Sequence, residues 1–177
     1  MSYLILSTSR NPASRSRILA QECMKALAAQ AGDDQVTWLD AGTMDLPICD
    51  GAEAWNHPSA VAIKDALERA SGVVLASGVY NYNASAAAKT VVELGASAWN
   101  DKVVAVCCAA GGAAAQMAPM SLITSLMLDF RCVIVPRYVY ATGGDFVDDA
   151  VTEQVQERVD QLAEDLHRLT SCIASDT

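Results

Sequence analysis

The sequence predicts an α/β protein of three layers, in which a five-stranded parallel sheet lies between two layers of helices. Short apolar runs alternate with segments whose apolar residues recur every three or four positions, as in strands followed by amphipathic helices. Hydrophobic residues make up 52% of the chain and charged residues 19%, which suits a sheet covered on both faces. A chain of 177 residues is expected to form one domain, residues 1–177.

The first half of the chain reads as strand, helix, strand and helix. The apolar run Leu4–Leu6 is the first strand, and Ser16–Ala31 is a helix because its apolar residues recur at helical spacing. Val36–Leu39 is the second apolar run, and a long connection, residues 40–58, follows it. The next helix is Ser59–Ala70, for which Ser59 is a suitable N-cap.

The second half continues the alternation. The expected third, fourth and fifth strands are the apolar runs Val73–Ala76, Val103–Cys108 and Cys132–Val135. The segments with helical spacing are Ala86–Leu94, Met120–Leu128 and the amphipathic Val151–Leu169. Tyr138–Asp148 is expected to be irregular, and residues 171–177 are expected to form a polar, mobile tail.

Three unusual loops follow the first, third and fourth strands. They are Ser7–Ser16, Ser77–Ser85 and Ala109–Ala115. In a doubly wound parallel sheet, ligands bind outside the carboxyl ends of the strands, at the point where the strand order reverses. We therefore expect the three loops to meet at one edge of the sheet and to form a binding site there.

The first loop is rich in hydroxyls and arginines. Residues 7–17 include five hydroxyls, three arginines and no acid. Helix N–H groups, the helix dipole and hydroxyls together favour a phosphate monoester, and Arg10 or Arg15 supplies a charged contact. The glycine fingerprints of dinucleotide and nucleoside triphosphate sites are absent from the loop. The alternative is an ordinary polar helix start that is capped by Ser14 or Ser16.

The other two loops suit a flat ring. Tyr80 and Tyr82 flank Asn81 just beyond the third strand, and an aromatic plane with nearby amides favours a hydrogen-bonding ring. Gly111 and Gly112 permit a close approach of the backbone to such a ring. The alternatives are that the two tyrosines pack across a subunit contact and that the glycines form a flexible turn.

With these motifs, the chain resembles the NADPH-dependent FMN reductase family. The segments that carry the resemblance are the serine-rich turn Ser7-Thr8-Ser9-Arg10 with Ser14-Arg15-Ser16, the motif Gly78-Val79-Tyr80-Asn81 with Lys89 eight residues beyond its Asn, and the turn Ala110-Gly111-Gly112. Two residues depart from the family's pattern. Gly78 replaces the usual proline of the second motif, and Ser7 replaces the first glycine of the first turn.

The resemblance implies a flavodoxin-like fold with strand order 2-1-3-4-5 and a bound FMN. It implies that the FMN phosphate is held by Ser9, Arg10, Ser14 and Ser16, with Arg10 as the favoured charged contact. It further implies that Val79, Tyr80 and Asn81 line the flavin ring and that Gly111 and Gly112 approach its pyrimidine edge. Proteins of this kind are commonly homodimers or homotetramers, so an oligomer is expected.

The charge of the chain and the lack of targeting patterns indicate which partners and which location to expect. The net charge of −9 argues against a nucleic-acid partner. No signal peptide is visible and no apolar run reaches the ~20 residues of a membrane span, so a cytoplasmic protein without a membrane partner is expected. The six cysteines form no Cys-x-x-Cys pair, so no metal site is expected; Cys107, Cys108 and Cys132 fall in apolar runs and are expected in the core.

The resemblance implies an enzyme in which FMN accepts a hydride from NADPH or NADH and passes electrons to a flavin, a quinone or a similar small molecule. This chemistry requires no acid–base side chain, and no catalytic residue is assigned. One alternative is a flavodoxin-like electron carrier that binds FMN without oxidising NAD(P)H. Another is a non-redox domain that binds a phosphate ligand on the same fold.

Overall fold

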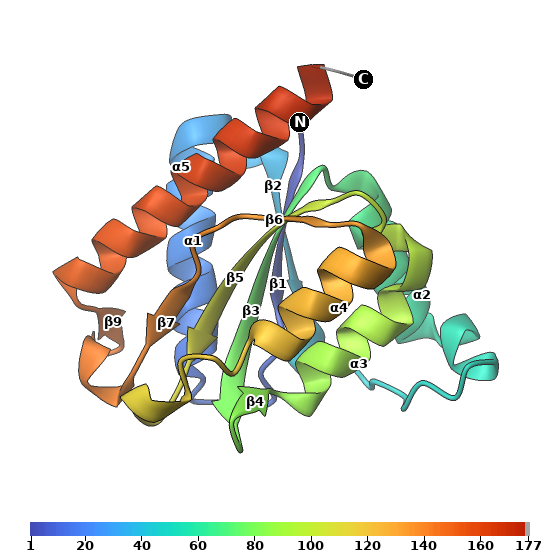
Figure 1. The fold of residues 1–177 in the computed structure, drawn as a ribbon, viewed down its shortest axis with the longest axis horizontal. Coiled ribbons are helices and arrows are strands. Elements are labelled where there is room, and N and C mark those ends of the chain that lie inside the picture. Colours follow the sequence, from blue (N-terminus) through green and yellow to red (C-terminus); the bar gives the residue numbers. More distant parts are fainter. Residues whose placement is uncertain (176–177) are drawn as a thin grey trace.

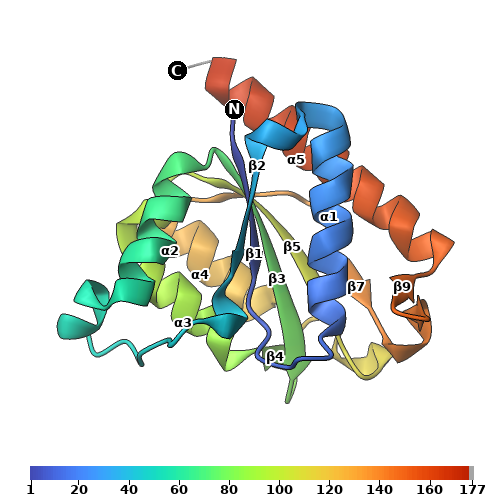
Figure 2. The same ribbon diagram turned by 180° about the vertical axis from the view of Figure 1, so that it is seen from behind.

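The computed structural model describes residues 1–175 and shows a parallel sheet between two layers of helices (Figures 1 and 2). The parallel strands are β1 (Tyr3–Ser7), β2 (Val36–Asp40), β3 (Gly72–Tyr80), β5 (Val103–Ala109), β6 (Val133–Ile134) and β7 (Val139–Ala141). Their order is β2-β1-β3-β5-β6, and β7 also pairs with β5. When β6 and β7 together count as the fifth strand, the predicted order 2-1-3-4-5 and the three-layer fold are confirmed.

Helices cover both faces of the sheet. α1 (Arg15–Ala31) and α5 (Glu153–Ser175) lie side by side on one face of the sheet, to the left of the strands in Figure 1 and to their right in Figure 2. The opposite face, to the right of the strands in Figure 1, carries α2 (Pro58–Arg69), α3 (Ala86–Gly95) and α4 (Met120–Phe130). Short 3₁₀ turns occupy several connections, namely η1 (Asp33–Gln35), η2 (Ala41–Thr43), η3 (Glu53–Asn56), η4 (Ala96–Trp99), η5 (Ala113–Ala115) and η6 (Gly143–Asp145).

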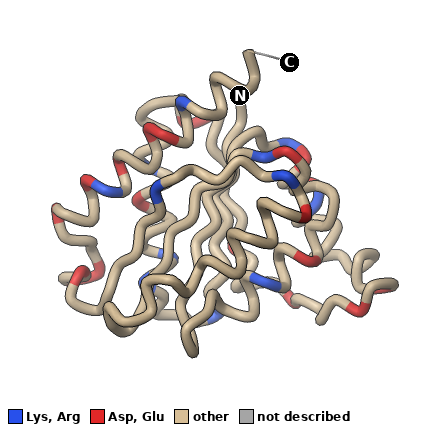
Figure 3. The backbone as a smooth tube through the Cα atoms, viewed as in Figure 1, with Lys and Arg blue, Asp and Glu red and all other residues tan. Residues whose placement is uncertain are grey.

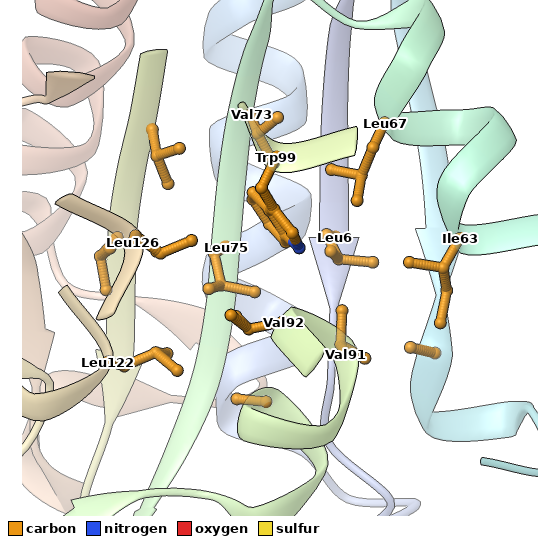
Figure 4. Packing of buried hydrophobic residues seen from close by; sticks show 14 of the residues in the cluster. Leu6, Ile63, Leu67, Val73, Leu75, Val91, Val92, Trp99, Leu122 and Leu126 are labelled. Carbon is orange, nitrogen blue, oxygen red and sulfur yellow. The ribbon is translucent and has the colours of Figure 1, made fainter. Parts of the chain in front are cut away.

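Alternate residues of the strands enter two separate cores, because successive side chains of a strand point to opposite faces. Leu4 and Leu6 of β1 pack beneath α2 and α3, whereas Tyr3 and Ile5 pack beneath α1 and α5. Figure 4 shows the first core, in which Trp99 lies among aliphatic side chains and is fully buried. β1, β3 and β5 contain no charged residue, and in Figure 3 the charges lie on the surrounding helices and loops.

The fifth strand differs from the prediction. The expected strand Cys132–Val135 is present as β6, but it is only part of the fifth strand, because β6 pairs with the beginning of β5 and β7 pairs with its end. Pro136 lies between the two pieces, and proline has no N–H to donate to the ladder. The chain therefore leaves the sheet and rejoins it within the segment that was predicted to be irregular.

Two hairpins were also missed. β3 continues to Tyr80 and pairs with the antiparallel strand β4 (Asn83–Ala84), so much of the expected loop Ser77–Ser85 is a hairpin. A second hairpin joins β8 (Phe146–Val147) to β9 (Ala150–Val151). In Figure 1, strand β9 of this hairpin lies beside β7, below the N-terminal end of α5.

Two helix ends also differ from the prediction. The N-cap of α2 is His57, whose Nδ1 accepts the N–H of Ser59, so Ser59 is not the cap. Helix α5 extends through Ser175, so residues 171–175 of the predicted tail are helical. Residues 176 and 177 of that tail lie outside the described residues.

Candidate functional site

A cleft of about 410 Å³ lies at the carboxyl edge of β1, β3 and β5, toward which their arrowheads point in Figure 1. The three loops that the sequence predicts to meet supply most of its lining, which is Ser9, Asn11, Ala13, Ser14, Arg15, Ser16, Ile18, Gly78, Val79, Tyr80, Ala109, Ala110, Gly111 and Asp149. Of the nine predicted binding residues, the cleft brings together Ser9, Ser14, Ser16, Val79, Tyr80 and Gly111. Arg10, Asn81 and Gly112 are not part of this lining.

The β1–α1 loop, residues 8–14, presents hydrogen-bonding groups at the N-terminus of α1. Ser14 is the N-cap, and its Oγ accepts the N–H of Arg17 at 3.1 Å. The Oγ atoms of Ser14 and Ser16 lie 3.0 Å apart, and both residues are buried. Arg15 and Ser16 begin the helix, where N–H groups have no intrahelical acceptor. Hydroxyls and N–H donors are therefore concentrated at this end of the cleft.

The two arginines of this region point in different directions. Arg10 is exposed, and its Nη1 donates to the carbonyl oxygen of Met44 at 3.3 Å, in the connection after β2. Arg15 lines the cleft, with its guanidinium carbon 5.5 Å from the centre of the Phe146 ring. A guanidinium over an aromatic face is held by cation–π attraction while its N–H groups remain available. The cation that the cleft itself presents is thus Arg15.

The β3–β4 hairpin places two tyrosines beside the cleft. Asn81 and Tyr82 form its tip with φ values of 50° and 63°, the left-handed conformation that a two-residue hairpin turn requires. Tyr80 and Tyr82 are 55% and 66% exposed. At the base of the hairpin, Ser77 Oγ accepts the N–H of Ser85 at 3.1 Å. Tyr80 therefore stands on a hydrogen-bonded hairpin, with its ring partly exposed and lying so close to Gly78 that a Cβ atom there would come 3.2 Å from Tyr80 Cε2.

The glycine turn after β5 has open space beside it. A Cβ atom built on Gly111 or Gly112 meets nothing within 4 Å, so packing within the protein does not require these glycines. The carbonyl oxygen of Gly112 accepts a hydrogen bond from the hydroxyl of Tyr140 at 2.7 Å. The turn is therefore fixed from one side and open on the side of the cleft.

Sequence reasoning missed the fourth wall of the cleft, which the β8–β9 hairpin supplies. Asp148 and Asp149 form the tip with φ values of 49° and 60°, and Asp149 lines the cleft. Aspartate tolerates this conformation better than most residues. The Asp-Asp pair between two short apolar stretches was the available signal, but tertiary packing decides that the hairpin reaches α1.

Other predicted features are local. Lys89 pairs with Glu93 at 3.1 Å across one helical turn.

Burial raises the pKa of Cys108 to about 12 and that of Cys132 to about 11. Within residues 1–175, no group of three or more His, Cys, Asp or Glu side chains is arranged to hold a metal ion. In the same part of the chain, every helix is too short or too polar to span a bilayer.

Comparison with solved structures supports the fold. An oxidoreductase from Corynebacterium diphtheriae is 20% identical with a TM-score of 0.79, covering 97% of each chain. An NADH:FMN oxidoreductase (EmoB) in its apo form is 16% identical with a TM-score of 0.74, covering 93% of this chain and 89% of the other. A flavodoxin from the domain Archaea is 14% identical with a TM-score of 0.68, covering 97% and 99%. At these identities, the likeness shows the fold alone.

The family follows from the sequence match. No curated protein matches the chain significantly. The family model described as NADPH-dependent FMN reductase matches residues 1–146, which include β1, β3, β5 and the three loops of the cleft. The chain therefore belongs to the NADPH-dependent FMN reductase family.

Proposed function

We propose that the chain is a single FMN-binding domain that oxidises NAD(P)H and passes the electrons to a small-molecule acceptor. The description of its family names FMN and NADPH, and a solved structure of similar fold is an NADH:FMN oxidoreductase. The observation that carries the proposal is the composition of one cleft, which joins the hydroxyls of Ser14 and Ser16 to the Gly111 turn and the Tyr80 ring. The hydrogen-bond donors for a phosphate lie at the wall formed by the β1–α1 loop. The surfaces that suit a flat ring lie at the walls formed after β3 and β5.

The donor set fits a phosphate monoester. Ser9, Ser14 and Ser16 supply hydroxyls, and the first turn of α1 adds N–H groups and the positive end of its dipole. Arg15 faces the cleft and neutralises charge there, whereas Arg10 reaches the phosphate only by leaving the Met44 carbonyl.

The other walls suit the flavin ring. Val79 and Tyr80 offer an apolar and an aromatic surface, and Asn81 at the hairpin tip adds an amide. Gly111 and Gly112 let the backbone approach the pyrimidine edge, where their N–H groups bond ring carbonyls. When bound, FMN supplies the hydride-accepting and electron-donating chemistry. The protein residues bind and orient it, and none is assigned a proton transfer.

We further propose that the protein is a homodimer or homotetramer. Tyr80 and Tyr82 stand exposed beside the cleft, and Met127 and Leu128 are exposed on α4. Exposed apolar side chains of this size favour a subunit contact. Light scattering at micromolar concentration tests this point, and a monomer would contradict it.

A flavodoxin-like electron carrier is the second candidate, because the net charge of −9 suits docking to a basic redox partner. A stopped-flow experiment separates the two functions. The FMN-loaded protein is mixed with NADPH or NADH without oxygen, and the visible absorbance of the flavin is followed. Rapid bleaching supports the reductase. A flavin that stays oxidised with both nucleotides supports the carrier, and a protein that binds no FMN contradicts both candidates.

A further inference from the structure

Arg17 lies behind the β1–α1 loop and binds its backbone. Its Nη2 donates to the carbonyl oxygen of Ser9 at 3.1 Å, and its Nη1 donates to the carbonyl oxygens of Asn11 and Pro12 at 3.1 Å and 3.4 Å. Its Nε donates to Asp40 Oδ2 at 2.8 Å. Arg17 and Asp40 are only 21% and 16% exposed at their side chains. One guanidinium therefore gathers three carbonyls of the loop.

The contact with the Ser9 carbonyl orients a donor of the loop, whereas the peptide after Asn11 has no N–H because it is that of Pro12, and the N–H of Ala13 already donates to Asn11 Oδ1 at 3.0 Å. In a trans peptide the C=O and the N–H point in opposite directions, so the Ser9 carbonyl that faces Arg17 turns the N–H of Arg10 away from it. Phosphate loops usually achieve such an arrangement with glycines, and residues 7–17 contain none. In other phosphate loops, the conformational freedom of glycine allows this loop shape. Here the hydrogen bonds of Arg17 stabilise it.

Asp40 and Gly42 hold this arrangement from the side of β2. Asp40 Oδ1 accepts the N–H of Gly42 at 3.1 Å, while Oδ2 binds Arg17. The backbone of Gly42 passes so close to the loop that a Cβ atom there falls 1.9 Å from the Ser9 carbonyl oxygen. The Ser9 carbonyl is therefore fixed between Arg17 and Gly42. Because Asp40 compensates the charge of Arg17, this arginine serves the loop and is not offered to a ligand.

We propose that Arg17, held by Asp40, is a positioning residue that shapes the β1–α1 loop to receive the phosphate monoester end of the ligand. The inference rests on the proposed function, in which that ligand is FMN. Arg17 acts on the phosphate end alone, because its partners belong to the β1–α1 loop and to Asp40 and none belongs to the walls that receive the ring. Its loss therefore weakens FMN binding and leaves the binding of riboflavin, which lacks the phosphate, unchanged.

The test compares FMN and riboflavin as ligands of the full chain. Arg17→Gln is titrated with each flavin, and Arg17→Lys is added because an ammonium keeps the charge but cannot bind three carbonyls and Asp40 in one plane. We expect Arg17→Gln to lose at least about tenfold in FMN affinity, and Arg17→Lys to lose less. Riboflavin affinity should stay within about twofold in both. Arg131→Gln, which breaks the exposed pair with Asp101 at 3.1 Å, is the matched control and should leave both affinities unchanged.

A second variant covers the case in which Arg17→Gln does not fold. Gly42→Ala displaces the Ser9 carbonyl without changing any charge, and it should reproduce the selective loss of FMN affinity. The inference is overturned if the folded variants bind FMN as the wild type does, or if FMN and riboflavin affinities fall by the same factor. A wild type that binds no FMN overturns the proposed function itself, and the inference with it.

Discussion

The hydroxyl of Tyr140 donates a hydrogen bond to the carbonyl oxygen of Gly112 at 2.7 Å. Tyr140 lies on β7 and is 5% exposed, and burial is the main cause that raises its pKa. The guanidinium of Arg158 on α5 in turn donates to the Tyr140 carbonyl oxygen at 3.0 Å. The C-terminal helix and the displaced half of the fifth strand therefore fix the glycine turn of the cleft.

The change Tyr140→Phe removes this tether and keeps the ring. We expect FMN affinity to fall about 2- to 13-fold, since a neutral hydrogen bond contributes about 0.5–1.5 kcal/mol. Titration of the variant with FMN measures the effect. The control is Tyr138→Phe, which removes a similar bond to the Gln116 carbonyl oxygen, outside the lining of the cleft. Equal affinities for both variants would show that the tether is irrelevant to binding.

Arg15 and Arg10 should differ as partners of the phosphate. Arg15→Gln removes the cation that lines the cleft, whereas Arg10→Gln removes one that is bonded to the Met44 carbonyl. We expect the Arg15 variant to lose about tenfold in FMN affinity and the Arg10 variant less than threefold. The loss should shrink as salt is added, because screening weakens exposed charge pairs. A larger effect at Arg10 would assign the charged contact to that residue instead.

Gly95→Ala should destabilise the fold without touching the cleft. A Cβ atom there lies 2.4 Å from Trp99 Nε1 and 2.7 Å from Leu67 Cδ1, and both side chains are fully buried. We expect a loss of about 1–3 kcal/mol, as for other overpacked cores, and a lower thermal midpoint. Gly144→Ala is the control, because its Cβ meets nothing within 4 Å. Equal midpoints for both variants would contradict the packing described.

The six cysteine thiols should fall into two classes by their reactivity in the native protein. Burial raises the pKa of Cys108 to about 12 and that of Cys132 to about 11, so neither forms the reactive thiolate near pH 8. Cys172 is exposed and Cys49 is half-buried. We expect a disulfide reagent at pH 8 to modify at most these two of the six cysteines in the native protein, and all six after denaturation. Rapid native modification of Cys108 or Cys132, found by peptide mapping, would contradict the burial.

The fold could be predicted from the sequence because local patterns decide it. The runs at Leu4–Leu6, Val73–Ala76 and Val103–Cys108 are too apolar for any place but a buried sheet, and the loops after them meet at one edge as expected. The split of the fifth strand was not predicted. β6 pairs only with the beginning of β5, so the end of β5 is left for the chain beyond Pro136 to pair with. This pairing is decided in the assembled sheet and not by the local sequence.

The roles of the arginines could not be read from the sequence. Arg10, Arg15 and Arg17 lie within eight residues of one another and look alike in sequence. Their partners, respectively Met44, Phe146 and Asp40, come from distant segments, and these long-range contacts separate their roles. The same holds for Asp149, which reaches the cleft only because the β8–β9 hairpin packs near α1.

A crystal structure of the protein with FMN tests the central claim most directly. The account predicts the phosphate within hydrogen-bond distance of Ser14 Oγ, Ser16 Oγ and the N–H of Arg15, at the N-terminus of α1. It predicts the flavin ring between Tyr80 and the Gly111 turn. A phosphate bound elsewhere, or a ring that lies outside the walls formed after β3 and β5, would contradict the account.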